Sequence, residues 1–366
     1  MLYFYRGWNS GTNQAVLNAW CKIGSQISIN AYDLDMLVFH NLKNKIRAVP
    51  YAFRRGGIKA FLPGGGRFFD AVKRSDWYMK TISDKVEILE DSMNFDFSLS
   101  IGTVIPNLNP ARPHFIYTDL TIRANSYYPE GEKRLDLWKE CIPYEEQSLK
   151  KATLVFTMSN HVTRSLVEQY NLPREKIVRV NGGINSPVPD KYDPARYSRK
   201  NILFVGTQWE LKGGPQLVEA FKKVQYRYPE STLTITGCSP KVKGHGINVV
   251  GYVPQKEISK YMANACCFCM VSRREAFGIS YIEAMHAGLP VIASDLGAAP
   301  DFVIDDQTGF LVDPDDSDGL AERIIELISN PGKCRYMGEK ARLLVKAEYT
   351  WEKTQQNMYH AICNVI

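Results

Sequence analysis

The chain has 366 residues, and one hydrophobic core usually splits beyond about 250 to 300 residues, so we expect two domains. The sequence contains no apolar run of about 18 residues or more, and its start, "MLYFYRGWNSG", lacks the charged and apolar regions of a secretion signal. We therefore expect a soluble, cytoplasmic protein. The formal net charge of +6 is modest for this length and gives no reason to expect a nucleic-acid partner.

The cysteines are interpreted as reduced thiols. Eight are present, and apart from "CCFC" at 266–269 they are scattered, without a Cys/His set at zinc-like spacing. Free cysteine packs like a small hydrophobic residue, so "CCFC" is interpreted as part of a buried strand. We expect no structural metal here.

Short apolar strands alternate with longer helical patterns along the chain, which is typical of βαβ units and a parallel sheet. In the first half the pattern predicts a helix at 12–24 and strands at 1–7, 26–32, 97–102, 114–119, 152–159 and 176–185. In the second half it predicts helices at 214–228, 256–265 and 279–286, and strands at 201–208, 231–237, 247–253, 266–272 and 290–295. A polar stretch with several prolines separates the halves and is interpreted as a linker.

Positive charge is concentrated at residues 51–85, where eight Lys and Arg face three Asp, a local surplus of five. Aromatic and apolar residues, among them Phe53, Phe61 and Trp77, lie between these charges. Such a mixture suits a membrane surface or an anionic acceptor, and it equally suits an ordinary solvated face.

Two acids flank the start of the helix predicted at 279–286. Gly278 leaves room for a ligand to approach, and the free N–H groups of the first helical turn attract phosphate. Glu275 precedes this helix, and the side chain of Glu283, one turn into it, leans toward its amino end. Because acids are poor phosphate ligands but good acceptors for sugar hydroxyls, the pattern indicates a nucleoside diphosphate sugar: ribose, diphosphate, sugar.

The segment "FVGTQWELKGG" adds a cation to this site. Lys212 follows a predicted strand and the Gly206 turn, and it precedes Gly213 and Gly214. A lysine at this position is a suitable counter-charge for a departing diphosphate.

With these segments, and with "VVGYVPQKEISKYMANA", "TGFLVDPDD" and "YTWEKTQQNMYHAI", the sequence resembles glycosyltransferase family 4, the retaining enzymes of the GT-B fold. The resemblance covers the second half and the end of the first. It implies an α/β fold of two Rossmann-like domains facing a central cleft. The expected domains are an acceptor-binding domain (1–185), a linker (186–200), a nucleotide-sugar-binding domain (201–348) and a C-terminal helix that crosses back to the first domain (349–366).

The resemblance also implies roles for individual residues. Glu275 contacts the donor sugar, Glu283 the ribose, and Lys212 neutralises the diphosphate. The implied catalytic residues are Lys212, Glu275 and Asp119. The implied donor-binding residues are Gly11, Gly206, Thr207, Lys212, Gly237, Tyr252, Glu275, Ala276, Phe277, Gly278, Ile279 and Glu283.

The sequence departs from the family pattern at two of these positions. Thr207 stands where many relatives have an arginine, so another group must help to neutralise phosphate. Asp119 stands where many relatives have a histidine, and it either replaces the sugar or acceptor contact or is structural. The acid pair Asp33 and Asp35 imitates the metal site of the other glycosyltransferase fold, but it lacks supporting context and we expect no metal there.

The implied function is retaining, metal-independent transfer of a sugar from a nucleoside diphosphate sugar to a hydroxyl of a glycan, lipid or small molecule. No cofactor other than this donor is expected. The alternatives are a nucleotide-sugar epimerase of the same fold and a non-catalytic binding subunit. Peripheral contact with the inner face of a membrane is expected through residues 51–85.

Overall fold

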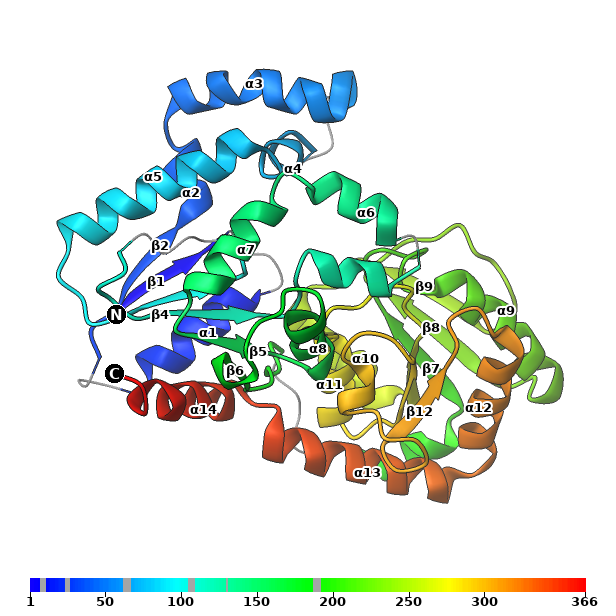
Figure 1. The fold of residues 1–366 in the computed structure, drawn as a ribbon. Coiled ribbons are helices and arrows are strands. Elements are labelled where there is room, and N and C mark those ends of the chain that lie inside the picture. The colour runs from blue at the N-terminus through cyan, green and yellow to red at the C-terminus, as the bar shows by residue number, and fades with distance from the viewer. Residues whose placement is uncertain (7–10, 24–26, 62–66, 105–108, 130, 187–191) are drawn as a thin grey trace. The chain divides into compact units, whose positions relative to one another are not determined.

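A computed structural model of the chain describes residues 1–6, 11–23, 27–61, 67–104, 109–129, 131–186 and 192–366 (Figure 1). The chain forms two compact units. Residues Met1–Val180 and Gln355–Ile366 make the first, and Asn181–Thr354 make the second. Each unit contains a six-stranded sheet whose neighbouring strands are all parallel. The predicted α/β class with two Rossmann-like domains is confirmed.

The sheet of the first unit has the strand order β2-β1-β3-β4-β5-β6. Its strands are β1 (Leu2–Tyr5), β2 (Asn30–Asp33), β3 (Ser98–Ile101), β4 (His114–Thr118), β5 (Leu154–Thr157) and β6 (Ile177–Arg179). Every residue of β1, β4 and β5 is buried, which explains why these strands are continuous apolar runs rather than alternating ones.

The helices of the first unit are α1 (Thr12–Cys21), α2 (Leu34–Phe39), α3 (Leu42–Gly56), α4 (Arg67–Val72), α5 (Asp76–Ser92), α6 (Gly131–Trp138), α7 (Ile142–Lys151) and α8 (Asn160–Glu168). The short 3-10 segments η3 (Gly57–Phe61), η4 (Arg123–Tyr127) and η5 (Arg174–Lys176) connect them. Sequence periodicity did not predict the helices α2 to α5, which lie between β2 and β3, or α6 and α7, which lie between β4 and β5. In Figure 1, α3 is the outermost of them, on the far side of α5 from the sheet.

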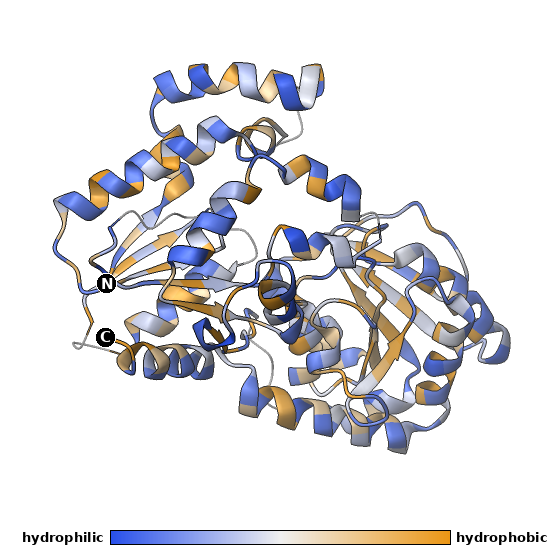
Figure 2. Ribbon diagram, viewed as in Figure 1, coloured by the Kyte–Doolittle hydropathy of each residue, from blue (hydrophilic) through white to orange (hydrophobic). Residues whose placement is uncertain are grey.

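The sheet of the second unit has the order β12-β11-β10-β7-β8-β9. Its strands are β7 (Asn201–Val205), β8 (Thr232–Thr236), β9 (Ile247–Gly251), β10 (Cys267–Met270), β11 (Val291–Ser294) and β12 (Gly309–Val312). Around it are α9 (Gly214–Arg227), α10 (Gln255–Asn264), α11 (Ile279–His286), α12 (Ser317–Ser329) and α13 (Pro331–Glu348), with the 3-10 segment η7 (Ala299–Asp301). The apolar character of both sheets is visible as orange strands in Figure 2. Sequence periodicity missed β12, α12 and α13.

The part of the expected linker that the structure describes packs into the second unit. The 3-10 segment η6 (Pro194–Ser198) buries Arg196 and Tyr197 completely or nearly so. Arg196 donates to the carbonyl oxygens of Ala287 (2.7 Å) and Gly288 (2.8 Å), just beyond the end of α11. A buried cation at a helix carboxyl end is favourable, so this segment helps to fix α11. Residues 187–191 of the expected linker lie outside the described residues.

The last helix, α14 (Trp351–Cys363), carries the chain back to the first unit, as expected from the resemblance. Tyr359 packs edge-on against Trp20 of α1, with ring centroids 6.4 Å apart. Trp351, at the start of the helix, still belongs to the second unit, where its indole N–H donates to Asn185 Oδ1 (3.0 Å).

Candidate functional site

Three glycines stand at the carboxyl ends of neighbouring strands in the second unit. Gly206 follows β7, Gly237 follows β8, and Gly251 ends β9. Gly206 N donates to Thr236 O (3.0 Å), and Gly237 N donates to Gly251 O (2.8 Å). A Cβ on Gly237 would lie only 2.9 Å from Gly206 O, and its φ is +88°. At this edge Gly206 and Gly237 are half-buried and Gly251 is buried, and without side chains on the first two a ligand can approach their backbone closely.

The two side chains that sequence reasoning placed on a donor's diphosphate and sugar contact each other. Lys212 Nζ lies 2.5 Å from Glu275 Oε2, and the two side chains are 21% and 12% exposed. The loops that carry them are pinned together, because Arg273 N donates to Leu211 O (2.9 Å). Gly213 completes this packing, since a Cβ there would meet Val271 O at 2.0 Å. The pair is thus held at the carboxyl edge between β7 and β10.

The amino end of α11 lies directly after this pair. Gly278 precedes the helix in the left-handed conformation (φ 91°, ψ 56°), and no side chain among the described residues caps the helix. A Cβ on Gly278 would lie 2.3 Å from Tyr281 Cδ2, so only glycine fits this turn. Tyr281 N already donates to Gly278 O (2.9 Å), so the N–H groups that an anion can meet at this helix start are those of Ile279 and Ser280, near the ion pair of Lys212 with Glu275.

Glu283 is 5% exposed, and its Oε1 accepts from Asn185 N (3.1 Å) and Ser186 N (2.8 Å). Burial raises the pKa of this carboxyl, and the hydrogen bonds partly offset that effect. The side chain holds the backbone where the chain enters the second unit. Its contact with a ribose stays a prediction.

The other expected donor-binding residues fall into two environments. Thr207 is exposed, and Tyr252 is 79% exposed, so both can reach a ligand; Ala276 and Ile279 are partly exposed. Phe277, by contrast, is 3% exposed, and its ring packs 5.9 Å from that of Phe302. Only the main chain of Phe277 can therefore meet a ligand.

Two expected site residues, Gly11 and Asp119, belong to the first unit. Gly11 precedes α1 with φ 75°, and Asp119 is exposed directly after β4. Because both follow the carboxyl ends of parallel strands, they lie at the same edge of their sheet, with β3 between β1 and β4.

Because Thr207 replaces an arginine, the sequence predicted that a second cation would help to neutralise the diphosphate, but it did not identify that residue. The segment "SRREAFG" places Arg273 and Arg274 directly before Glu275. Arg273 forms an ion pair with Asp315, and Arg274 is half-buried beside the site. The two consecutive arginines were visible in the sequence. Only the structure shows that their loop packs against the loop that carries Lys212, so that they are candidates for the second cation.

The acid pair that imitated a metal site has structural partners. Asp33 caps α2 by accepting from Asp35 N (2.9 Å), and Asp35 forms an ion pair with Lys73 (2.6 Å). Within the described ranges, no group of three or more His, Cys, Asp or Glu side chains is arranged to hold a metal ion. In the same ranges, no helix is both long and apolar enough to cross a membrane.

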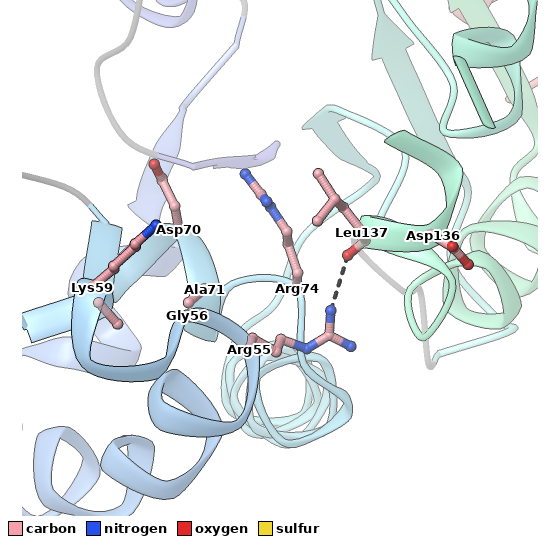
Figure 3. Close-up of a pocket in the computed structure, with 9 residues that line it drawn as sticks. Arg55, Gly56, Lys59, Asp70, Ala71, Arg74, Asp136 and Leu137 are labelled. Carbon is pink, nitrogen blue, oxygen red and sulfur yellow. Dashed lines mark hydrogen bonds between the residues drawn. The ribbon is translucent and has the colours of Figure 1, made fainter. Parts of the chain in front are cut away.

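A separate cavity of about 460 Å³ lies in the first unit (Figure 3). It is lined by Arg55, Gly56, Lys59, Ala60, Asp70, Ala71, Arg74, Asp136 and Leu137. Arg55 is already engaged, since it donates to Leu137 O (2.9 Å) and pairs with Glu140 (2.6 Å). The rest of the charged lining is two cations, Lys59 and Arg74, and two carboxylates, Asp70 and Asp136, so its formal charges balance.

Comparison with known proteins connects the second unit to one family. Residues 193–344 match the family model described as glycosyl transferases group 1. The chain is 26% identical over 242 residues to O-antigen chain mannosyltransferase B of Escherichia coli, covering 58% of this chain and 62% of that protein. It is 31% identical over 246 residues to the GDP-mannose-dependent monoacylated alpha-(1-6)-phosphatidylinositol monomannoside mannosyltransferase of Corynebacterium glutamicum, covering 58% and 63%. The chain thus matches less than two thirds of the length of these relatives.

Solved structures match over nearly the whole chain. Sucrose-phosphate synthase from Thermosynechococcus elongatus aligns with a TM-score of 0.68 at 17% identity, covering 99% of this chain and 98% of that one. A lipopolysaccharide outer core galactosyltransferase aligns with a TM-score of 0.67 at 14% identity, covering 100% and 99%. The fold is therefore GT-B, and the part of the chain that holds Lys212, Glu275 and Glu283 is similar to the group 1 glycosyl transferases.

Proposed function

We propose that the protein is a retaining glycosyltransferase that moves a sugar from a nucleoside diphosphate sugar to an acceptor hydroxyl without a metal ion. The observation that carries this proposal is the Lys212–Glu275 pair, 2.5 Å apart, beside the amino end of α11. A cation, an acid and free backbone N–H groups at one strand edge match the needs of a diphosphate joined to a sugar. The match of residues 193–344 to group 1 glycosyl transferases supports the same assignment.

In the proposed reaction, the bound donor separates the pair. Lys212 turns from Glu275 to the diphosphate, and Glu275 accepts hydrogen bonds from the sugar hydroxyls. The bond between the anomeric carbon and the diphosphate oxygen then breaks, and the diphosphate takes the electron pair. Lys212 and the amino end of α11 stabilise that charge. The acceptor oxygen attacks the same face of the sugar and bonds to the anomeric carbon, while its proton passes to a diphosphate oxygen.

The acceptor is proposed to bind the first unit, where Asp119 contacts the sugar or the acceptor. A lipid acceptor is consistent with the names of two relatives, both phosphatidylinositol monomannoside mannosyltransferases, from Corynebacterium glutamicum and Mycolicibacterium smegmatis. Peripheral contact with the cytoplasmic face of a membrane through residues 51–85 is part of this proposal.

A thermal-shift panel of nucleoside diphosphate sugars tests the proposal, with GDP-mannose included because these relatives are named for it. A donor should raise the melting temperature of the unmodified protein and not that of Lys212→Ala. NMR of the product should show an unchanged anomeric configuration, and EDTA should leave the rate unchanged. Conversion of the nucleotide sugar to its epimer without acceptor would instead establish an epimerase. Binding without any turnover of donor, across a panel of acceptors, would establish a binding subunit.

A further inference from the structure

The outermost helix of the first unit exposes a stripe of large apolar side chains. On α3, Leu42 is 69% exposed, Ile46 63%, Val49 43% and Phe53 58%. Their spacing of four, three and four residues keeps them on one side of the helix. Ala48 and Ala52, on another side, are completely buried. Packing against the rest of the unit therefore uses the small residues and leaves the large ones in water.

The charged residues of α3 and η3 themselves all have one sign. Residues 42–61, which comprise α3 and η3, contain Lys and Arg but no Asp or Glu. The exposed cations among them are Lys43, Lys45, Arg47, Arg54 and Lys59. Figure 2 shows the resulting alternation of hydrophilic and hydrophobic colours along α3.

The stripe continues beyond the helix, through Ile58 (73% exposed) and Phe61 (47% exposed) of η3. Further along, Phe69 is still 38% exposed, but Trp77 and Tyr78 pack against the core of the unit. Tyr78 is completely buried, and the ring of Trp77 stacks on that of Tyr51 at 5.6 Å. The exposed amphipathic surface is thus residues 42–61, and it begins nine residues before the segment that the sequence indicated.

We infer that residues 42–61, hereafter the α3 surface, dock the protein onto a bilayer that contains anionic phospholipid. A helix with apolar side chains on one side and cations beside them lies in the plane of a membrane interface, with the apolar side chains in the acyl region. Each cation near an anionic surface adds about fivefold to the binding constant, from roughly 1 kcal/mol per Lys or Arg.

Charge complementarity favours a bilayer over a second copy of the chain. In a symmetric dimer through this surface, the cations of one α3 would face those of the other, and like charges repel. The inference deepens the membrane contact of the proposed function, on which it rests, by naming the surface and the lipid charge, and it depends on no property of the Lys212–Glu275 pair.

Co-sedimentation of the whole protein with vesicles tests the inference. One set contains phosphatidylglycerol in phosphatidylcholine, and the other contains phosphatidylcholine alone, each at low and high salt. One variant replaces the stripe with serine at Leu42, Ile46, Val49 and Phe53. A second replaces the cations Lys43, Lys45, Arg47 and Arg54 with serine. A matched control replaces four exposed lysines of the second unit, Lys222, Lys241, Lys243 and Lys340, with serine.

We expect the unmodified protein and the control to bind phosphatidylglycerol vesicles at low salt and to be released at high salt. Both α3 variants should bind at least tenfold more weakly. Binding by the stripe variant should still fall with salt, whereas the weak binding of the cation variant should not. All variants should keep their thermal shift with a nucleotide sugar, so a failure here is separate from a failure of the proposed function.

Two results would overturn the inference. The first is that the unmodified protein does not bind phosphatidylglycerol vesicles, or that the α3 variants bind as well as the control. The second is that light scattering shows a dimer which the stripe variant converts to a monomer while no form binds vesicles, because the α3 surface would then be a contact between copies.

Discussion

Each unit has its own parallel six-stranded sheet, but the two units offer ligands different kinds of chemical group. The second unit presents backbone: glycines at the ends of β7, β8 and β9, a helix start without a side-chain cap among the described residues, and one ion pair. The first unit presents side chains, in a cavity with a charged lining and on the α3 surface. The family match at 193–344 lies wholly in the second unit. A binding site made of backbone groups needs glycine at particular positions in the sequence. A binding surface made of side chains needs only residues of the right character, such as basic or apolar ones, and many sequences provide these.

The largest effect should come from removing the one cation of the pair. Lys212→Ala should lower the transfer rate by about 10²-fold to 10³-fold, the scale of losing one charge stabiliser in the transition state. The melting temperature should change little, since partly exposed ion pairs contribute about 1 kcal/mol or less to stability. Lys222→Ala on α9, an exposed lysine of the same unit, is the control and should keep the full rate. Near-normal turnover by Lys212→Ala would refute the assigned role.

Two glycine substitutions compare how much close backbone packing contributes to the stability of each unit. Gly213→Ala in the second unit should cost about 3 kcal/mol or more of unfolding free energy, because φ is +74° and the new Cβ would meet Val271 O at 2.0 Å. Gly57→Ala in the first unit should cost less, about 1 to 2 kcal/mol, because its φ of 54° and ψ of −151° strain an alanine but no described atom lies within 4 Å of the new Cβ. Urea denaturation measures both, with probes in each unit because two domains need not unfold together. Equal costs would show that close packing at Gly213 is unimportant.

The stability of the first unit should depend on pH through Glu145. Burial raises the pKa of this carboxyl from an ordinary value of 4.5 to about 7, although Thr103, Tyr170 and Ile122 N donate to it. The folded state therefore holds the proton more tightly, so this contribution is present below pH 4.5 and is lost as pH rises through 7, by about 3 kcal/mol.

Glu145→Gln removes that titration and leaves the other groups in place. The unfolding free energy of the unmodified protein minus that of the variant should therefore be larger at pH 5 than at pH 8. Denaturant curves at the two pH values give this difference directly. A difference that stays constant with pH would mean that the folded and unfolded forms of Glu145 bind protons equally.

The smallest expected effects distinguish the proposed roles of Glu275 and Glu283 in the second unit. Glu283→Gln should weaken binding of the free nucleoside diphosphate by roughly tenfold, the scale of losing one hydrogen bond from a charged group. Glu275→Gln should lower transfer while nucleotide binding stays within about twofold, because its proposed partner is the sugar. Calorimetric titration of both variants with the nucleoside diphosphate alone checks this. If Glu275→Gln weakens nucleotide binding as much as Glu283→Gln, the two roles are wrongly assigned.

The sequence by itself determined the strands of the first sheet and all but β12 of the second. Buried parallel strands must be short apolar runs, so their positions are visible in any reading of the chain. The turns at Gly206 and Gly278 were also visible, because close backbone approach and positive φ leave few residue types to choose from. Lys212 and Glu275 were identified by their positions beside those turns.

Only the tertiary structure decided which side chains face which partners. Glu283 was predicted to lean toward the amino end of α11 and a ligand, and in the structure the N–H groups of Asn185 and Ser186 donate to its Oε1. Arg196 looked like part of a polar linker and is completely buried beneath α11. On α3, the stripe at Leu42 and Phe53 resembles any core-facing pattern until the packing of Ala48 and Ala52 shows which side is covered. Periodicity fixes the faces of a helix, and contacts distant in sequence decide which face meets water.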